Sequence, residues 1–183
     1  KGIAYPEALG SFQKPGTGVW SIDRIGAASI EALDSATMTE VQSSGDGATL
    51  HVKDPVVFDS PAGGTALMFC SHPFGWSSSN TGLAKRGEGE VEFVLQTRSV
   101  LERGATWDVA CARVTDRLAV PQVGLLAGLP PLSLYFYDGA ECLRSLDENA
   151  KAVSRPRGYS CEELGGLAWG WDAEFPKMQR LSL

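Results

Sequence analysis

The stretch Thr81-Gly82-Leu83-Ala84-Lys85 constrains the fold most, because two related pentapeptides occur elsewhere in the sequence. They are Ile25-Gly26-Ala27-Ala28-Ser29 and Gly165-Gly166-Leu167-Ala168-Trp169. Glycine and alanine let neighbouring strands approach closely, as crowded strands near a propeller axis require. A four-stranded propeller blade takes roughly 40–50 residues. The first interval between copies fits one blade, and the second fits one blade with a long insertion. The pattern therefore predicts repeated blade-like sheets.

Strand-like runs dominate the rest of the chain. Glu90–Thr97 alternates apolar and polar residues, which is typical of a strand with one wet face. Leu132–Tyr137 is strongly β-prone, and Asp138-Gly139 after it resembles a hairpin turn. Helical signal is confined to a turn or two at Glu31–Met38 and Cys142–Ala152. We predict a single all-β domain over residues 1–183, with about three to four propeller-like blades over residues 18–183. A jelly-roll β-sandwich is the alternative.

Composition excludes several classes of function. The chain has 183 residues and a net charge of −6, whereas nucleic-acid-binding proteins usually present a basic surface, so no nucleic-acid partner is expected. No run of 18 apolar residues predicts a membrane span. The sequence has two histidines and four cysteines, and no two cysteines form a Cys-x-x-Cys pair. We therefore expect no metal site and no cofactor. The cysteines are expected to be free and mostly buried.

The segment His51-Val52-Lys53-Asp54-Pro55-Val56-Val57-Phe58, followed by Gly63–Ser71, resembles a motif of a known superfamily. It is similar to the Asp-Pro-apolar strand, glycine turn and aromatic-rich strand that recur in five-bladed propeller glycoside hydrolases. That superfamily includes arabinanases, xylosidases, invertases and mannoside phosphorylases. Their blades often continue into an Ile-Gly-x-Ala-x-Ser strand, which Ile25–Ser29 matches well and the other two copies match in part.

The resemblance implies glycoside hydrolysis by carboxylates at the inner strand ends, around a funnel on the propeller axis. Asp54 occupies the position of the Asp-Pro aspartate of the superfamily. In those enzymes this aspartate usually stabilises the transition state or tunes the pKa of the catalytic acid. Glu162 is distantly similar to the acid of the Glu-Cys element in invertase-like members, although Cys161 precedes it here. The Asn-Asp-Pro element that supplies the invertase nucleophile is absent. We expect Asp54 and Glu162 to be catalytic, with Asp23 as a third candidate.

Candidate substrate-binding residues surround these carboxylates in the sequence. The polar, aromatic loop Ser71–Asn80 supplies Trp76, which could stack on a sugar ring, and His72 and Asn80, which could bind hydroxyl groups. Arg24 and Glu163, next to two candidate carboxylates, complete the predicted set. Trp169 and Trp171 alternate with Gly170 and are expected on one sheet face, as core or as a platform. A non-catalytic carbohydrate-binding β-sandwich that uses Trp76 and His72 is the alternative function.

Chain length sets a further expectation. Five blades of the usual size need roughly 200–250 residues, which is more than this sequence contains. A partial propeller would leave open strand edges and faces. Three alternatives follow: the sequence is a portion of a propeller, the remaining blades come from another chain, or the fold is different. We expect a carbohydrate substrate as partner and, under the second alternative, a chain that supplies the missing blades.

Overall fold

A computed structural model describes residues 2–3, 19–43, 52–71, 79–141 and 163–181 of the chain. In this part of the protein the regular elements are β-strands and 3-10 turns, with no α-helix, so the predicted all-β class is confirmed. The strands are β1 (Gly2–Ile3), β2 (Val19–Trp20), β3 (Ile22–Ile25), β4 (Met38–Gln42), β5 (Val52–Asp59), β6 (Thr65–Ser71), β7 (Asn80–Arg86), β8 (Val94–Leu101), β9 (Cys111–Ala119), β10 (Leu132–Ala140), β11 (Glu163–Trp171) and β12 (Gln179–Arg180).

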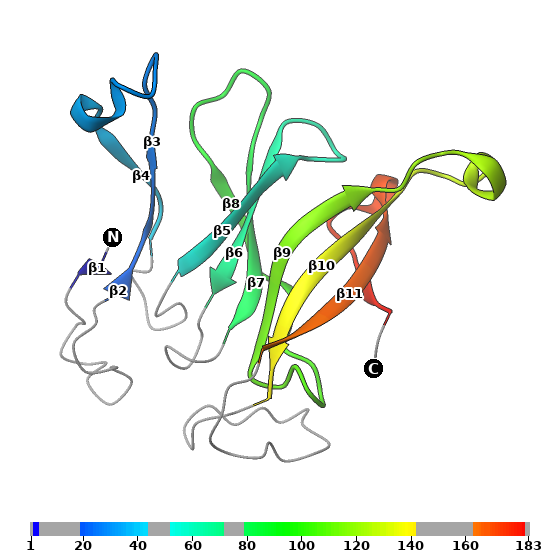
Figure 1. The fold of residues 1–183 in the computed structure, drawn as a ribbon. Coiled ribbons are helices and arrows are strands. Elements are labelled where there is room, and N and C mark those ends of the chain that lie inside the picture. The colour runs from blue at the N-terminus through cyan, green and yellow to red at the C-terminus, as the bar shows by residue number, and fades with distance from the viewer. Residues whose placement is uncertain (1, 4–18, 44–51, 72–78, 142–162, 182–183) are drawn as a thin grey trace.

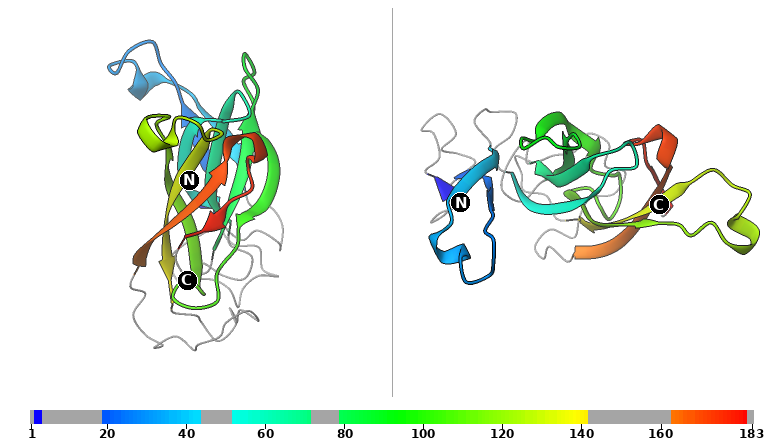
Figure 2. Two further views of the ribbon diagram at one scale, coloured as in Figure 1. Left: turned by 90° about the vertical axis from the view of Figure 1, so that its right-hand side faces the viewer. Right: turned by 90° about the horizontal axis from the view of Figure 1, so that it is seen from above.

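Two four-stranded antiparallel meanders form most of the molecule. In the first sheet, β5, β6, β7 and β8 are neighbours in sequence order, and in the second sheet so are β9, β10, β11 and β12. The shorter pairs β1–β2 and β3–β4 are separate antiparallel sheets. Figure 1 shows the β3–β4 pair, the first sheet and the second sheet following one another across the molecule, and Figure 2 shows the same succession from above. Neither four-stranded sheet closes on itself.

The two larger hydrophobic clusters of the described residues lie on opposite faces of the first sheet. Met68 and Leu83 pack with Tyr135 and Tyr137 of the second sheet. Residues that alternate with them in β6 and β7 point the other way: Leu67, Phe69 and Ala84 pack with Ile22 and Val41 of the β3–β4 pair. Strand β6 is therefore buried on both faces, which explains its unbroken apolar sequence.

The two meanders are structural repeats of each other. In β7, Gly82, Leu83 and Ala84 pair with Phe69, Met68 and Leu67 of β6. In β11, Gly166, Leu167 and Ala168 pair with Tyr137, Phe136 and Tyr135 of β10. A Cβ atom would lie 2.7 Å from the Phe69 ring at Gly82 and 2.3 Å from Tyr137 at Gly166, so both glycines make room for an aromatic ring. Two of the three predicted copies are thus equivalent third strands.

Several local predictions differ from the structure. The copy at Ile25–Ser29 is not a strand, because β3 ends at Ile25. Strand β8 begins at Val94, so the first half of the predicted Glu90–Thr97 strand precedes it, and Val91 there is exposed. The helical segment expected at Glu31–Met38 is one 3-10 turn over Leu33–Ser35. The second predicted helical segment, Cys142–Ala152, lies outside the described residues.

Candidate functional site

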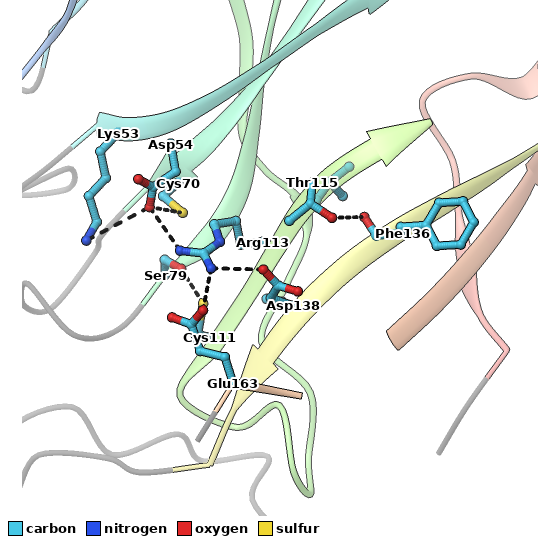
Figure 3. A network of polar contacts seen from close by, with 12 residues as sticks. Lys53, Asp54, Cys70, Ser79, Cys111, Arg113, Thr115, Phe136, Asp138 and Glu163 are labelled. Atoms are coloured by element: carbon cyan, nitrogen blue, oxygen red, sulfur yellow. Dashed lines mark hydrogen bonds and ion pairs between the residues drawn. The ribbon is translucent and has the colours of Figure 1, made fainter. Parts of the chain in front are cut away.

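Three carboxylates from three strands converge on the guanidinium group of Arg113. Its Nη1 atom donates to Asp54 Oδ2 at 3.2 Å, and its Nη2 atom donates to Asp138 Oδ2 at 2.9 Å and to Glu163 Oε2 at 2.5 Å. Figure 3 shows this cluster, with Asp54 reaching Arg113 from the first sheet and Asp138 and Glu163 from the second. We call these four residues the Arg113 cluster.

Strand register explains why the second-sheet members of the cluster share one face. Arg113 is directly opposite Asp138, and Glu163 is opposite Ala140, two residues further along β10. Residues two apart on a strand point to the same face. Gly165, the partner of Asp138 on β11, has no atom within 4 Å of the position its Cβ would occupy. The side of Asp138 next to Gly165 is therefore open.

Asp54 reaches the cluster through a distortion of β5. Its backbone φ is +53°, in the left-handed region that non-glycine residues seldom adopt, and the pairing of β5 with β6 shifts register between Lys53 and Val56. Such outliers cluster at functional sites, where the surrounding contacts hold them. Here Asp54 also lies 4.0 Å from Lys53 Nζ and 3.5 Å from the Cys70 thiol.

The cluster is partly open to solvent. The Asp54, Asp138 and Glu163 side chains are 39%, 33% and 50% exposed, whereas that of Arg113 is 20% exposed. Burial lowers the pKa of Arg113, but the hydrogen bond to Asp138 and the charge of Glu163 raise that pKa more, so it lies above its ordinary value. Arg113 remains cationic at any physiological pH. Three carboxylates against one guanidinium and Lys53 leave the group net negative.

Two buried thiols lie beside the Arg113 cluster. Cys111 Sγ is 3.0 Å from Ser79 Oγ, and both Cys70 and Cys111 are free, in agreement with the prediction for these two cysteines. Burial raises the pKa of both thiols, and the neighbouring charge of Asp54 raises that of Cys70 further. Both are therefore neutral at physiological pH. The described residues contain no group of ligands that could hold a metal ion.

The structure brings two of the predicted site residues together and separates two others from them. Asp54, expected to be catalytic, and Glu163, expected to bind substrate, are brought together by Arg113. Asp23 and Arg24 lie on β3, in the layer against the other face of the first sheet; Asp23 accepts a hydrogen bond from Ser21, and Arg24 donates to the carbonyl of Val91.

Asn80 lies outside the Arg113 cluster. Asn80 Oδ1 accepts the backbone N–H of Arg103 at 2.9 Å, a contact that links β7 to the segment after β8. Glu162, His72 and Trp76 lie outside the described residues.

Sequence reasoning missed two members of the cluster. Asp138 is not in a hairpin turn, because β10 continues to Ala140 and carries its side chain toward Arg113. The sequence context of Asp138 could have indicated a site residue, because Asp138 follows the most β-prone run of the chain just as Asp54 adjoins an apolar strand. Arg113 stands between the buried Ala112 and Val114, and this alternation could have indicated an outward-facing cation.

A second ion-pair centre is structural in character. Asp108 is buried, and its Oδ2 accepts from Arg180 Nε at 2.6 Å and from the Tyr137 hydroxyl at 3.4 Å. Trp107 stacks on Tyr137 with ring centroids 5.5 Å apart. A hollow of about 550 Å³ lies away from both centres, between the turns after β5 and β7, and is lined by residues such as Asp59, Arg86 and Glu90.

Comparison with known proteins finds no family, no curated protein and no solved structure that matches this chain. The described part of the chain also has no helix long and apolar enough to cross a membrane. The β-strands of the described residues place this chain in the all-β class of proteins.

Proposed function

We propose that this chain forms part of a β-propeller glycoside hydrolase, with the Arg113 cluster as the sugar-binding and catalytic centre. The observation that carries the proposal is the convergence of the Asp54, Asp138 and Glu163 carboxylates on one guanidinium group. Glycosidases need paired carboxylates and a further polar group that orients the sugar.

The order of the sheets supports the propeller. Each propeller blade is a four-stranded antiparallel meander, and blades follow one another around an axis. The first and second sheets have this topology, repeat the same glycine-ring contact and pack face to face. Asp54 and Arg113 are each the third residue of the first strand of their sheet. Equivalent positions on first strands would meet near the axis, where propeller enzymes bind substrate.

The spacing of two carboxylates supports a retaining mechanism. Asp138 and Glu163 bind the same Nη2 atom at 2.9 Å and 2.5 Å, so their bonded oxygens are at most about 5.4 Å apart. This upper limit lies below the separation of about 6.5–9.5 Å in inverting enzymes and agrees with the shorter separation in retaining enzymes. We assign this pair to nucleophile and acid–base roles, and Asp54 to orienting the sugar. The open side at Gly165 gives a ligand access to Asp138.

The experiment is a turnover screen with p-nitrophenyl glycosides and with polysaccharides assayed for released reducing ends. Asp138→Asn, Glu163→Gln and Asp54→Asn are each expected to lower kcat/KM by at least about 100-fold on any substrate that the chain hydrolyses. Asp116→Asn is the matched control, because Asp116 is an exposed aspartate of β9 whose Oδ1 accepts the backbone N–H of the neighbouring Arg117. Its turnover should equal that of the unchanged chain.

Two results would contradict the proposal. Turnover that survives all three cluster substitutions would place the reaction elsewhere. Sugar binding without turnover by the unchanged chain would instead support the carbohydrate-binding alternative.

A further inference from the structure

The Arg113 cluster, taken together with Lys53, carries one excess negative charge. The three carboxylates contribute three negative charges, whereas Arg113 and Lys53 contribute two positive charges. A ligand that brings a positive charge would neutralise this excess, whereas a ligand with a carboxylate group would be repelled. The charge of the site therefore discriminates among sugars. This inference rests on the proposed function, in which the Arg113 cluster binds a glycan.

The carboxylates of the cluster retain acceptor atoms for a cationic ligand. Asp54 and Asp138 each accept a hydrogen bond from Arg113 through Oδ2, and Glu163 accepts one through Oε2. The other oxygen of each carboxylate makes no hydrogen bond to Arg113. An ammonium group has three N–H donors and no acceptor, so it matches a set of carboxylate oxygens better than a hydroxyl group does.

Arg113, in contrast, has little to offer an acidic sugar. Both of its terminal nitrogens already bind carboxylates, Nη1 to Asp54 and Nη2 to Asp138 and Glu163. A carboxylate on the ligand would compete with these side chains for the same donors and would add charge to a group that is already negative. Sugars with a carboxylate group are therefore disfavoured at this site.

An open approach and an exposed aromatic ring lie beside the carboxylates. Gly165 leaves open space next to Asp138, and the three carboxylates are 33% to 50% exposed. Phe136 lies on the same face of β10, two residues or about 7 Å along the strand before Asp138, and is 42% exposed. Sugars present apolar C–H faces that pack on aromatic rings, and ligand sites combine such rings with a few polar groups. A glycan chain that reaches Asp138 thus has Phe136 beside its neighbouring sugar.

We propose that this site takes glycans with free amino groups, such as the glucosamine units of chitosan, and that Asp54 binds the ammonium group. Asp54 is the carboxylate that orients the sugar while Asp138 and Glu163 carry out the chemistry. Lys53 Nζ lies 4.0 Å from Asp54 Oδ2, so an ammonium group fits beside this carboxylate. The net charge of −6 on the chain also attracts a cationic glycan from solution.

The test is isothermal titration calorimetry with three hexamers that share a β-1,4-linked glucose backbone and differ only at the second carbon. The chitosan hexamer carries an amino group there, its N-acetylated equivalent carries an acetamido group, and cellohexaose carries a hydroxyl group. At pH 5.5 and low salt, the chitosan hexamer should bind at least about 5-fold more tightly than either neutral hexamer. Sodium chloride at 0.5 M should reduce this preference, because salt screens exposed charges.

Variants separate the site from the charge of the whole chain. Asp54→Asn should abolish the preference for the chitosan hexamer. Asp34→Asn, the matched control, makes the same change of charge in the exposed 3-10 turn between β3 and β4 and should retain the preference. Lys53→Met removes the competing cation and should raise the preference about 2-fold or more. Phe136→Leu removes the ring and should weaken the binding of all three hexamers to a similar extent.

Several results would overturn the inference. Equal affinity for the three hexamers, or no binding of any of them, would do so, as would a preference that survives Asp54→Asn or that Asp34→Asn reduces equally. Undiminished binding by Phe136→Leu would also overturn it. Circular dichroism of each variant should match that of the unchanged chain.

This inference and the proposed function can fail separately. A chain that prefers the chitosan hexamer but hydrolyses no glycoside would contradict the catalytic role alone. A chain that hydrolyses neutral glycosides and shows no preference among the hexamers would contradict this inference alone.

Discussion

Arg113 of β9 binds Asp54 of β5 with 3.2 Å between Nη1 and Oδ2, and this ion pair joins the first strands of two successive sheets. The same guanidinium group holds Asp138 and Glu163 within the second sheet. One side chain therefore links both sheets at the end of the molecule where the candidate site lies.

Replacing Arg113 with methionine should destabilise the protein by about 1–3 kcal/mol, because three neighbouring carboxylates lose their shared cation. Removing one partner of a buried pair costs about 3–5 kcal/mol, and partial exposure of the carboxylates reduces this figure. Urea unfolding measures the loss. Arg113→Lys keeps the charge but not the fork of donors and should lose less. Equal stability of the methionine variant and the unchanged chain would show that the cluster contributes nothing to folding.

Alanine substitutions at Gly166, the repeat position, and at its neighbour Gly165 should change stability to different extents. A Cβ at Gly166 would lie 2.3 Å from the Tyr137 ring, whereas Gly165 has open space. We expect Gly166→Ala to cost at least about 2 kcal/mol, in the range for overpacked cores, and Gly165→Ala to change stability by less than about 1 kcal/mol. Thermal unfolding of the two variants side by side measures the difference. A neutral Gly166→Ala variant would contradict the tight contact with Tyr137.

The buried thiols should make the protein less stable in alkali. Burial raises the pKa of Cys70 and Cys111 in the folded state, so above about pH 9 the unfolded chain loses protons that the folded chain retains. Stability is therefore complete below the unfolded thiol pKa and falls between that value and the higher folded one, by up to about 1.4 kcal/mol per pH unit for each thiol. Urea unfolding between pH 7 and pH 10.5 measures the slope. Cys111→Ala should reduce the slope, and an unchanged slope would contradict the assignment to this thiol.

The same burial predicts that both thiols are unreactive in the folded protein. Iodoacetamide labelling at pH 7.5, read for each cysteine by peptide mass spectrometry, should modify Cys70 and Cys111 at least about 100-fold more slowly than in urea. Rapid modification of either residue without urea would show that it is accessible.

Asp108 should matter for stability without belonging to the candidate site. It is buried and accepts hydrogen bonds from Arg180 and Tyr137. Asp108→Ala should cost about 3–5 kcal/mol, because Arg180 loses its partner and Tyr137 an acceptor. Denaturant unfolding provides the measurement. If the variant proves as stable as the unchanged chain, the Asp108–Arg180 pair is not a stabilising contact.

The sequence by itself determined the all-β class and the repeat that relates the two sheets. Apolar runs set the strands, and the glycines at positions 82 and 166 are informative because each must lie beside an aromatic ring in the neighbouring strand. Both signals are local or involve adjacent strands, so they are visible without coordinates.

Only the tertiary structure decided which charged residues meet. Asp54 and Arg113 are far apart in sequence and join because two sheets stack, and Asp138 enters the site because β10 continues past the position where a turn was predicted. Asp23 had an equally suitable sequence context but lies on the β3–β4 layer. A carboxylate beside an apolar strand is a local pattern, whereas the sheet end at which it lies depends on strand length, register and stacking, which are set by packing across the whole chain.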